Sequence, residues 1–296
     1  EALRIAKERG IPLVATFHSK YYDDFLKVLH SESMAKLVVA NVVRFYGKCD
    51  EVWAVSETTA KVLKEYGFDG FIRVVPNGAT LRTAREDALH AVETRFGIGS
   101  TPLLLYVGQI NWKKNLARVL EAAAILAKNG QEFVLLMAGQ GPDMDQVQSR
   151  IDELKLADRV RLIGHIGEME VLDALYARAA AFTFPSLYDN APMVVREAAV
   201  MGTPAVLVAG SDAAEIIHDG ANGFLCRDDA DDLSRVLSGI LENPVRAKEV
   251  GAAARETIPQ PWEQVMQQVA GHYDNLVQSN KSRRKPHATR GNEQTE

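Results

Sequence analysis

The sequence predicts an α/β protein built from two doubly wound parallel-sheet domains, the first of them incomplete. Three observations lead to this prediction. From residue 103 onward, short runs of Val, Leu, Ile and Phe alternate with longer amphipathic segments, which is typical of parallel strands covered by helices on both faces. The first hundred residues show the same alternation less completely. The chain of 296 residues, 47% hydrophobic and 25% charged, is long enough to bury two cores.

The first domain is expected to span residues 1–95. It opens in a helix over residues 2–9 that Gly10 closes. Strands are expected at 11–17, 52–55 and 72–75, and helices at 22–46 and 57–66. The turn 76–78 ends this part, and a polar helix and loop over 84–98 bridges to the next. Because three strands are few for such a sheet and the chain opens at Glu1 inside a helix, we expect an N-terminal truncation.

The second domain is expected to span residues 96–258. Strands are expected at 103–107, 133–138, 159–163, 181–184 and 204–208. Apolar residues at helical spacing mark two helices between these strands: Leu116, Val119, Leu120, Ala123 and Leu126 in one, and Val171, Leu172, Leu175 and Tyr176 in the other. One more amphipathic helix is expected at 259–278. Residues 279–296 are rich in Lys and Arg and poor in apolar side chains, which predicts a disordered tail.

Composition excludes several classes of function. The net charge of −5 gives no reason to expect a nucleic-acid partner. Cys49 and Cys226 lie far apart in no metal-like spacing, so both are expected to be buried free thiols in a reducing cytoplasm. No apolar run approaches a membrane-spanning length, and no signal peptide is visible. We therefore expect a cytoplasmic protein, with peripheral membrane contact as the alternative.

The residues that follow the strands of the second domain predict a ligand crevice. They form the loops 108–114, 139–142, 164–165 and 185–190. Ligands of open α/β sheets bind beyond the carboxyl ends of the strands, so these loops should border one crevice. Glycines allow close backbone approach, and helix N-termini offer free amides to a phosphate. Lys114 would add a positive charge to that field.

Each of these features also has a plain structural explanation. Gly139 and Gly141 fit a tight strand-to-helix turn equally well. Lys114 fits a solvated helix position, and Asp189 fits a helix N-cap. Glu197 is harder to explain, because its helix is mostly apolar and a carboxylate there needs a hydrogen-bonding partner. A ligand hydroxyl would be a suitable partner.

No metal site is expected. Asp143 and Asp145 resemble the short acidic metal-binding motif of another fold, but they lie in the first turn of an expected helix, where acids favour the helix dipole. The sequence also contains no nucleophile elbow, no His-Glu-x-x-His and no Walker loop. Chemistry that needs a resident metal, an acyl-enzyme or a P-loop therefore has no support.

Several segments together resemble the family 4 retaining glycosyltransferases of the GT-B fold, which has two Rossmann-like domains. That family carries two acids with seven residues between them, and Asp189 and Glu197 have this separation, with Asp in place of the usual Glu. Further segments match at 15–18, 55–56, 75–78, 106–108, 139–142, 202–204 and 219–225. The resemblance runs from about residue 11 to about residue 276.

The resemblance implies roles for particular residues. Glu197 would hydrogen-bond the nucleotide ribose, Asp189 would lie near the donor sugar, and Lys114 would bind the diphosphate. His18 would face donor and acceptor across the cleft, and the closing helix would pack back on the first domain. The implied catalytic residues are thus His18, Asp189 and Lys114. The implied donor-binding residues are Gly108, Gln109, Lys114, Gly139, Gly141, His165, Asn190, Ala191, Pro192, Met193, Val194 and Glu197.

The chain departs from the family pattern at three points. Gln109 stands where Arg is frequent, which should weaken stabilisation of the departing diphosphate, and Thr80 stands where Asp is common. The third is the missing N-terminal segment, whose glycine-rich loop usually touches donor and acceptor.

The expected function is retaining transfer of a sugar from a UDP- or GDP-linked donor to a hydroxyl of a glycan, lipid-linked or small-molecule acceptor, without metal or cofactor. Three alternatives stay open. One is a nucleotide-sugar epimerase of the same fold. Another is a phosphorylase, although no pyridoxal-binding lysine is identifiable. The third is a non-catalytic nucleotide-sugar-binding module, which Gln109 and the truncation favour.

Overall fold

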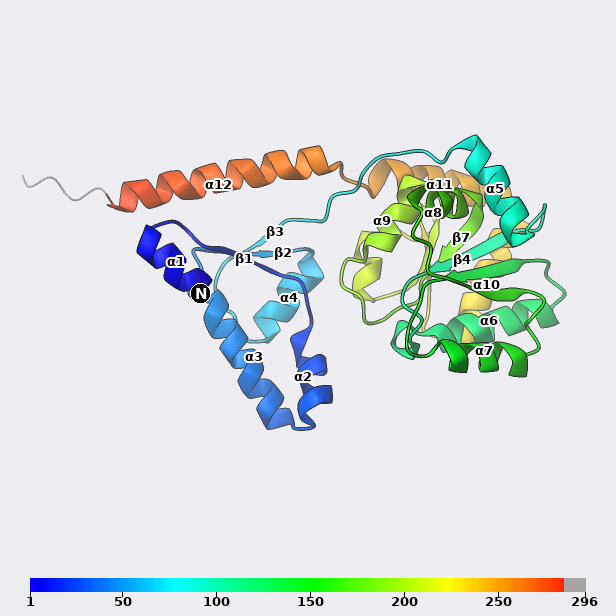
Figure 1. The fold of residues 1–296 in the computed structure, drawn as a ribbon, viewed down its shortest axis with the longest axis horizontal. Helices are drawn as coiled ribbons and strands as arrows, with labels where there is room; N and C mark the ends of the chain where they lie inside the picture. The colour runs from blue at the N-terminus through cyan, green and yellow to red at the C-terminus, as the bar shows by residue number, and fades with distance from the viewer. Residues whose placement is uncertain (285–296) are drawn as a thin grey trace, which may run out of the picture. The chain divides into compact units, whose positions relative to one another are not determined.

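The computed structural model of the chain describes residues 1–284, which form two compact units. Unit 1 holds residues 1–76 and the described residues from 263 onward, and unit 2 holds Asn77–Trp262. Each unit contains a parallel sheet of its own (Figure 1). Unit 2 begins before the expected boundary at residue 95, because helix α5 (Glu86–Phe96) packs on α8 (Met169–Arg178) of that unit.

The sheet of unit 1 has three parallel strands in the order β1-β2-β3. The strands are β1 (Val14–Phe17), β2 (Glu51–Ala54) and β3 (Ile72–Val74). Its helices are α1 (Ala2–Arg9), α2 (Tyr21–Leu29), α3 (Glu32–Tyr46), α4 (Glu57–Glu65) and α12 (Trp262–Arg284). The three expected strands are present.

The expectation of one helix over residues 22–46 is wrong, because the chain breaks between α2 and α3. His30 adopts a left-handed conformation with φ 51°, which ends α2. Ser31 then caps α3, its side chain accepting a hydrogen bond from the amide of Met34 at 3.4 Å.

Helices cover both faces of this sheet. Val52 and Trp53 are neighbours on β2, so their side chains point to opposite faces. One face carries an apolar cluster that extends to α3 and α4, and the other packs against α12. The first cluster holds Phe17, Tyr46, Val52, Leu63 and Phe68, and the second holds Trp53, Val265 and Val269.

Helix α12 continues beyond the expected closing helix, so the prediction of a disordered tail is wrong for residues 279–284. The side chain of Ser279 donates to the carbonyl of Asn275 at 2.8 Å, and that of Asn280 donates to the carbonyl of Gly10 at 3.4 Å. The polar composition of residues 279–284 predicted disorder, but these hydrogen bonds accompany the extra turns of α12. The remainder of the expected tail, residues 285–296, lies outside the described residues.

Unit 2 has a six-stranded parallel sheet in the order β6-β5-β4-β7-β8-β9. The strands are β4 (Leu103–Val107), β5 (Val134–Ala138), β6 (Val160–Gly164), β7 (Ala179–Thr183), β8 (Ala205–Val208) and β9 (Phe224–Cys226). Five were expected, and β9 was not, because three residues give no periodic signal. The strand order reverses between β4 and β7, which makes their carboxyl ends the switch point where ligands of such sheets bind.

Helices lie on both faces of this sheet. Figure 1 shows α6 and α7 below it and α5, α8 and α11 above it. Helix α6 packs on α10, and α9 packs on α11. The helices not yet placed are α6 (Leu116–Lys128), α7 (Met144–Glu153), α9 (Met193–Val200), α10 (Ala230–Glu242) and α11 (Pro244–Thr257), with the short 3-10 helices η1 (Trp112–Lys114) and η2 (Asp212–Ile216).

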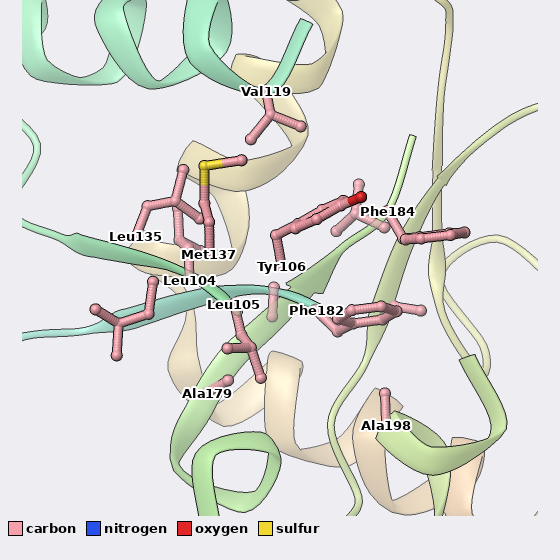
Figure 2. Packing of buried hydrophobic residues seen from close by; sticks show 14 of the residues in the cluster. Leu104, Leu105, Tyr106, Val119, Leu135, Met137, Ala179, Phe182, Phe184 and Ala198 are labelled. Atoms are coloured by element: carbon pink, nitrogen blue, oxygen red, sulfur yellow. The ribbon is translucent and has the colours of Figure 1, made fainter. Parts of the chain in front are cut away.

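The core of unit 2 follows the predicted apolar stripes. All five residues of the α6 stripe are buried, and so are Leu175 and Tyr176 of α8. Tyr106 and Leu105 extend from opposite faces of β4 (Figure 2), and the Tyr106 ring stacks on Phe184 at a centroid distance of 6.0 Å. Among residues 1–284, no helix combines the length and apolar character that crossing a membrane requires.

Candidate functional site

A cavity of about 370 Å³ opens at the carboxyl edge of the unit 2 sheet. The loops after β4, β5 and β6 meet there with the first turns of α9. Six of the predicted donor-site residues line it: Gly108, Gln109, Gly139, His165, Val194 and Glu197. The structure thus brings together residues that the sequence placed on separate loops.

Backbone contacts join the loops after β4 and β5. A Cβ atom on Gly139, whose φ is 145°, would overlap the carbonyl oxygen of Gly108. A Cβ on Gly141 would overlap the carbonyl oxygen of Ile110. Glycine is required at both positions because two loops pack backbone against backbone, whether or not a ligand is bound.

Hydrogen bonds fix the same floor of the cavity. The amide of Gly139 donates to the carbonyl of Gly164 at 2.8 Å, which joins the loops after β5 and β6. The buried Tyr106 hydroxyl donates to the Gln109 carbonyl at 2.9 Å. Burial raises the pKa of Tyr106, so this hydroxyl stays a protonated donor. The Gln109 backbone is therefore held while its side chain is exposed.

Glu197 lies on α9 and lines the cavity. Its Oε2 accepts a hydrogen bond from the hydroxyl of Tyr176 on α8 at 3.4 Å. Tyr176 therefore supplies one of the hydrogen bonds that the sequence analysis expected this carboxylate to need. Burial raises the pKa of Glu197, Arg82 and the Tyr176 hydrogen bond lower it, and Asp173 raises it.

Lys114 and Asp189 form an ion pair at the switch point. Lys114 ends η1, after β4, and its Nζ donates to Asp189 Oδ1 at 2.6 Å. Ser186 Oγ donates to the other carboxylate oxygen at 2.6 Å. The side chains of Lys114 and Asp189 are 14% and 21% exposed. Neither Lys114 nor Asp189 is among the described residues that line the cavity.

The plain explanations of both residues are wrong. Lys114 is paired and mostly buried, so it is no solvated helix residue. Asp189 is no N-cap, because α9 begins at Met193 with Pro192 in the cap position and no side-chain cap bond.

The loop before α9 carries backbone strain. Ala191 is buried and has φ 42°, a conformation that non-glycine residues rarely adopt. The side chain of Asn77 donates to its carbonyl at 3.5 Å. Asn190, Ala191 and Pro192 thus form the strained link between Asp189 and the helix of Glu197.

The remaining predicted residues fall elsewhere. His18 lies in unit 1 directly after β1, with an exposed side chain. Asp143 accepts a hydrogen bond from the amide of Trp112 at 2.9 Å, which explains this acid without a metal. Within residues 1–284, no group of three or more His, Cys, Asp or Glu side chains is arranged to hold a metal ion.

Three residues near Glu197 escaped the sequence analysis. Arg82 Nε donates to Asp173 Oδ2 at 2.6 Å, and Asp173 lies one helical turn before Tyr176. Tyr176 looked like a core residue because it sits on the apolar stripe of its helix. Arg82 and Asp173 are separated by 91 positions, and no pattern in the sequence connects them.

Residues 94–257 match the model of the family of glycosyl transferases group 1, and residues 1–82 match that of Glycosyltransferase Family 4. Since the first match covers more than half of the chain, the chain belongs to the glycosyl transferases group 1. This agrees with the resemblance found from the motifs.

Two curated relatives illustrate the family. The alpha-monoglucosyldiacylglycerol synthase of Streptococcus pneumoniae is 27% identical over 248 residues, which is 81% of this chain and 56% of that protein. A glycogen synthase of Mycobacterium tuberculosis is 30% identical over 156 residues, 52% of this chain and 37% of that protein. The chain spans about half, or less, of the length of these relatives.

Solved structures agree on the fold. Anabaena HepE in complex with UDP aligns with a TM-score of 0.79 at 18% identity, over 92% of this chain and 75% of that one. Sucrose-phosphate synthase from Thermosynechococcus elongatus aligns with a TM-score of 0.80 at 22% identity, over 93% and 70%. The GT-B fold predicted from the motifs, with a Rossmann-like parallel sheet in each unit, is confirmed.

Proposed function

We propose that this chain forms the donor-binding part of a glycosyltransferase that moves a sugar from a nucleotide-linked donor to an acceptor hydroxyl. The proposal includes retention of the anomeric configuration and independence from metal, both implied by the family resemblance. Family membership supports the reaction class, and the cavity of unit 2 supports the place where the donor binds.

The observation on which the proposal rests is an acid, Glu197, in the lining of the cavity. An ionised carboxylate only accepts hydrogen bonds, and it can serve two neighbouring hydroxyls at once, as a ribose presents them. Tyr176 donates to one of the two oxygens of Glu197, so the carboxylate keeps acceptor capacity for a ligand. The loops after β4, β5 and β6 also line the cavity and are joined backbone to backbone, so they offer a fixed floor against which a nucleoside can lie.

Lys114 is proposed to stabilise the departing diphosphate. Negative charge grows on the leaving group during transfer, and a fixed cation near it lowers the barrier. In the structure, Asp189 holds this cation at the end of η1. Donor binding would redistribute the pair, with Lys114 turning to the phosphates and Asp189 to the sugar.

UDP is the nucleotide we propose first. Structures of Anabaena HepE are described with UDP and with UDP-glucose. A GDP-mannose-dependent relative in Mycolicibacterium smegmatis, 26% identical over 247 residues, keeps GDP as the second candidate. The names of the relatives suggest a glycan or a diacylglycerol as acceptor.

Calorimetric titration with UDP, GDP and ADP tests the donor site. Glu197→Gln should weaken the tightest of these about 5- to 10-fold, because hydrogen bonds to a charged acceptor exceed neutral ones by about 1 to 1.5 kcal/mol. Glu153→Gln, at the exposed end of α7, is the matched control and should bind as the wild type does. Equal affinity of the wild type and Glu197→Gln would contradict the assignment.

Turnover of the donor tests the reaction. Transfer predicts that UDP release from UDP-sugars increases when a glycan or diacylglycerol acceptor is added, and that it persists in EDTA. Conversion of the donor sugar without UDP release would indicate an epimerase. Binding without any turnover would indicate a non-catalytic module, which the neutral Gln109 at the cavity favours.

A further inference from the structure

The segment at the start of unit 2 pairs with an acid that lies one helical turn from Tyr176, the hydrogen-bond partner of Glu197. Arg82 lies in this segment, between β3 and α5, and its Nε donates to Asp173 Oδ2 at 2.6 Å. Its Nη1 donates to the carbonyl of Thr80 at 3.3 Å, and its own carbonyl accepts from Arg255 Nη2 at 3.2 Å. Both the side chain and the backbone of Arg82 are therefore held in place.

Arg82 and Asp173 form a largely buried ion pair. Their side chains are 23% and 8% exposed, so solvent screens their charges only in part. Asp173 Oδ1 is buried and has no hydrogen-bond partner among the described residues. Arg82 is thus the group that compensates this buried acid.

Asp173 and Glu197 are two carboxylates in one neighbourhood. Asp173 and Tyr176 share a face of α8, and the Tyr176 hydroxyl donates to Glu197. The negative charge of Asp173 raises the pKa of Glu197, and the positive charge of Arg82 lowers it. His165, on the loop after β6, is the other titratable group in the described lining of the cavity. Among the groups on α8 and on the segment before α5, Arg82 is the cation that lowers the pKa of Glu197.

We propose that Arg82 is a positioning residue of the donor site, which keeps Glu197 in its ionised form as acceptor for the nucleotide hydroxyls. This inference rests on the proposed function of Glu197. The argument is electrostatic: a half-buried carboxylate beside a second acid tends to take up a proton, and a fixed guanidinium opposes this. The segment between β3 and α5 therefore contributes to nucleotide binding without contacting the nucleotide.

The test follows nucleotide affinity as a function of pH in the full chain. The probe is the tightest binder among UDP, GDP and ADP, titrated by calorimetry between pH 5.5 and 8.5. Arg82→Gln should bind like the wild type at pH 8.5 and at least about threefold more weakly than the wild type at pH 6. Arg82→Lys keeps the charge and should restore most of the loss. Arg85→Gln, an exposed arginine of the same segment, is the matched control.

Asp173→Asn sharpens the test, because it should act in the opposite direction. The Asn side-chain oxygen can still accept from Arg82, while the repelling charge is removed. Affinity for the nucleotide should then persist to lower pH than in the wild type. A merely structural role of the pair would weaken binding in both variants at every pH, and that result would overturn the inference. Thermal unfolding of each variant checks that the fold is intact.

The outcomes separate this inference from the proposed function. If none of the three nucleotides binds the wild type, or if Glu197→Gln binds normally, the donor-site assignment fails and the role of Arg82 fails with it. If Glu197→Gln weakens binding while Arg82→Gln leaves the pH profile unchanged, only the role of Arg82 fails. In the Glu197→Gln background, Arg82→Gln should have no pH-dependent effect, and a remaining effect would also overturn the inference.

Discussion

Replacing Lys114 by Met removes the cation that we place at the diphosphate while keeping much of the length and apolar character of the side chain. Lys114 is mostly buried, and its Nζ lies 2.6 Å from Asp189 Oδ1. We expect Lys114→Met to weaken nucleoside diphosphate binding, because the Met side chain lacks the ammonium group that would interact with phosphate.

The magnitude follows from the kind of bond that is lost. A hydrogen bond to a charged group contributes about 1.5 to 3 kcal/mol, which corresponds to roughly 10- to 150-fold in affinity. The nucleotide must first compete with Asp189 for the Lys114 ammonium, which offsets part of this gain. We therefore expect a loss near the lower end, about 10-fold.

Lys113→Met is the control for long-range charge. Lys113 is the neighbouring residue of η1 and is exposed, with its Nζ 4.8 Å from the centre of the Tyr188 ring. Both variants lower the net charge equally, so any general electrostatic attraction of the nucleotide falls equally in both. Calorimetry at fixed ionic strength should show a loss of no more than about twofold for Lys113→Met.

Asp189→Asn completes the comparison, because the removal of its charge frees Lys114 for the phosphates. Nucleoside diphosphate affinity should then stay the same or rise slightly, while sugar transfer falls. The interpretation would be refuted if Lys114→Met bound within twofold of the wild type, or if Lys113→Met lost as much as Lys114→Met. Asp189→Asn losing as much affinity as Lys114→Met would show that the pair matters only as a structural unit.

Two further predictions concern stability. Gly139→Ala should lower the free energy of unfolding by about 2 to 4 kcal/mol in urea titrations, since its Cβ would overlap the carbonyl oxygen of Gly108. Gly239→Ala meets open space within α10 and should instead gain about 0.5 to 1 kcal/mol, so equal effects of the two would contradict the packing argument. Burial raises the pKa of Glu197, so the folded chain binds this proton more tightly than the unfolded chain, and the penalty of the buried charge is relieved as pH falls through the raised pKa. Glu197→Gln should therefore unfold at the same or a higher temperature than the unliganded wild type at pH 8, and a clearly lower one would show that this charge stabilises the fold.

The central strands of unit 2 were predictable because they are buried on both faces and read as continuous apolar runs. β4 and β5 consist of apolar and aromatic residues throughout, so their positions could be predicted from these runs. The three-residue β9 was not predictable, since its pairing with β8 and not its own sequence makes it a strand. The break between α2 and α3 was missed because His30 takes a left-handed conformation that usually marks glycine or asparagine.

The site divides in the same way. Loops that follow parallel strands meet at one edge of the sheet, so the approach of Gly108, Gly139 and His165 followed from order alone. Which side chains then pair depends on contacts across many residues. The Lys114–Asp189 pair spans 75 positions, and its two residues lie on the segments that follow β4 and β7, the strands at the switch point. No local pattern carries that information, and the same holds for the pair formed by Arg82 and Asp173.

The structure also changes the interpretation of Gly139, Gly141 and Gln109 as indicators of phosphate binding. Gly139 and Gly141 are explained by the contact between two loop backbones, so they show that the cavity floor is rigid and do not by themselves indicate a phosphate. Gln109 has its carbonyl fixed by Tyr106 and its side chain exposed on the cavity. A different side chain here alters the charge offered to a ligand and leaves the floor unchanged. Under the proposed function, its departure from the family pattern would weaken the stabilisation of the leaving group, and we expect diphosphate binding in this chain to depend on Lys114.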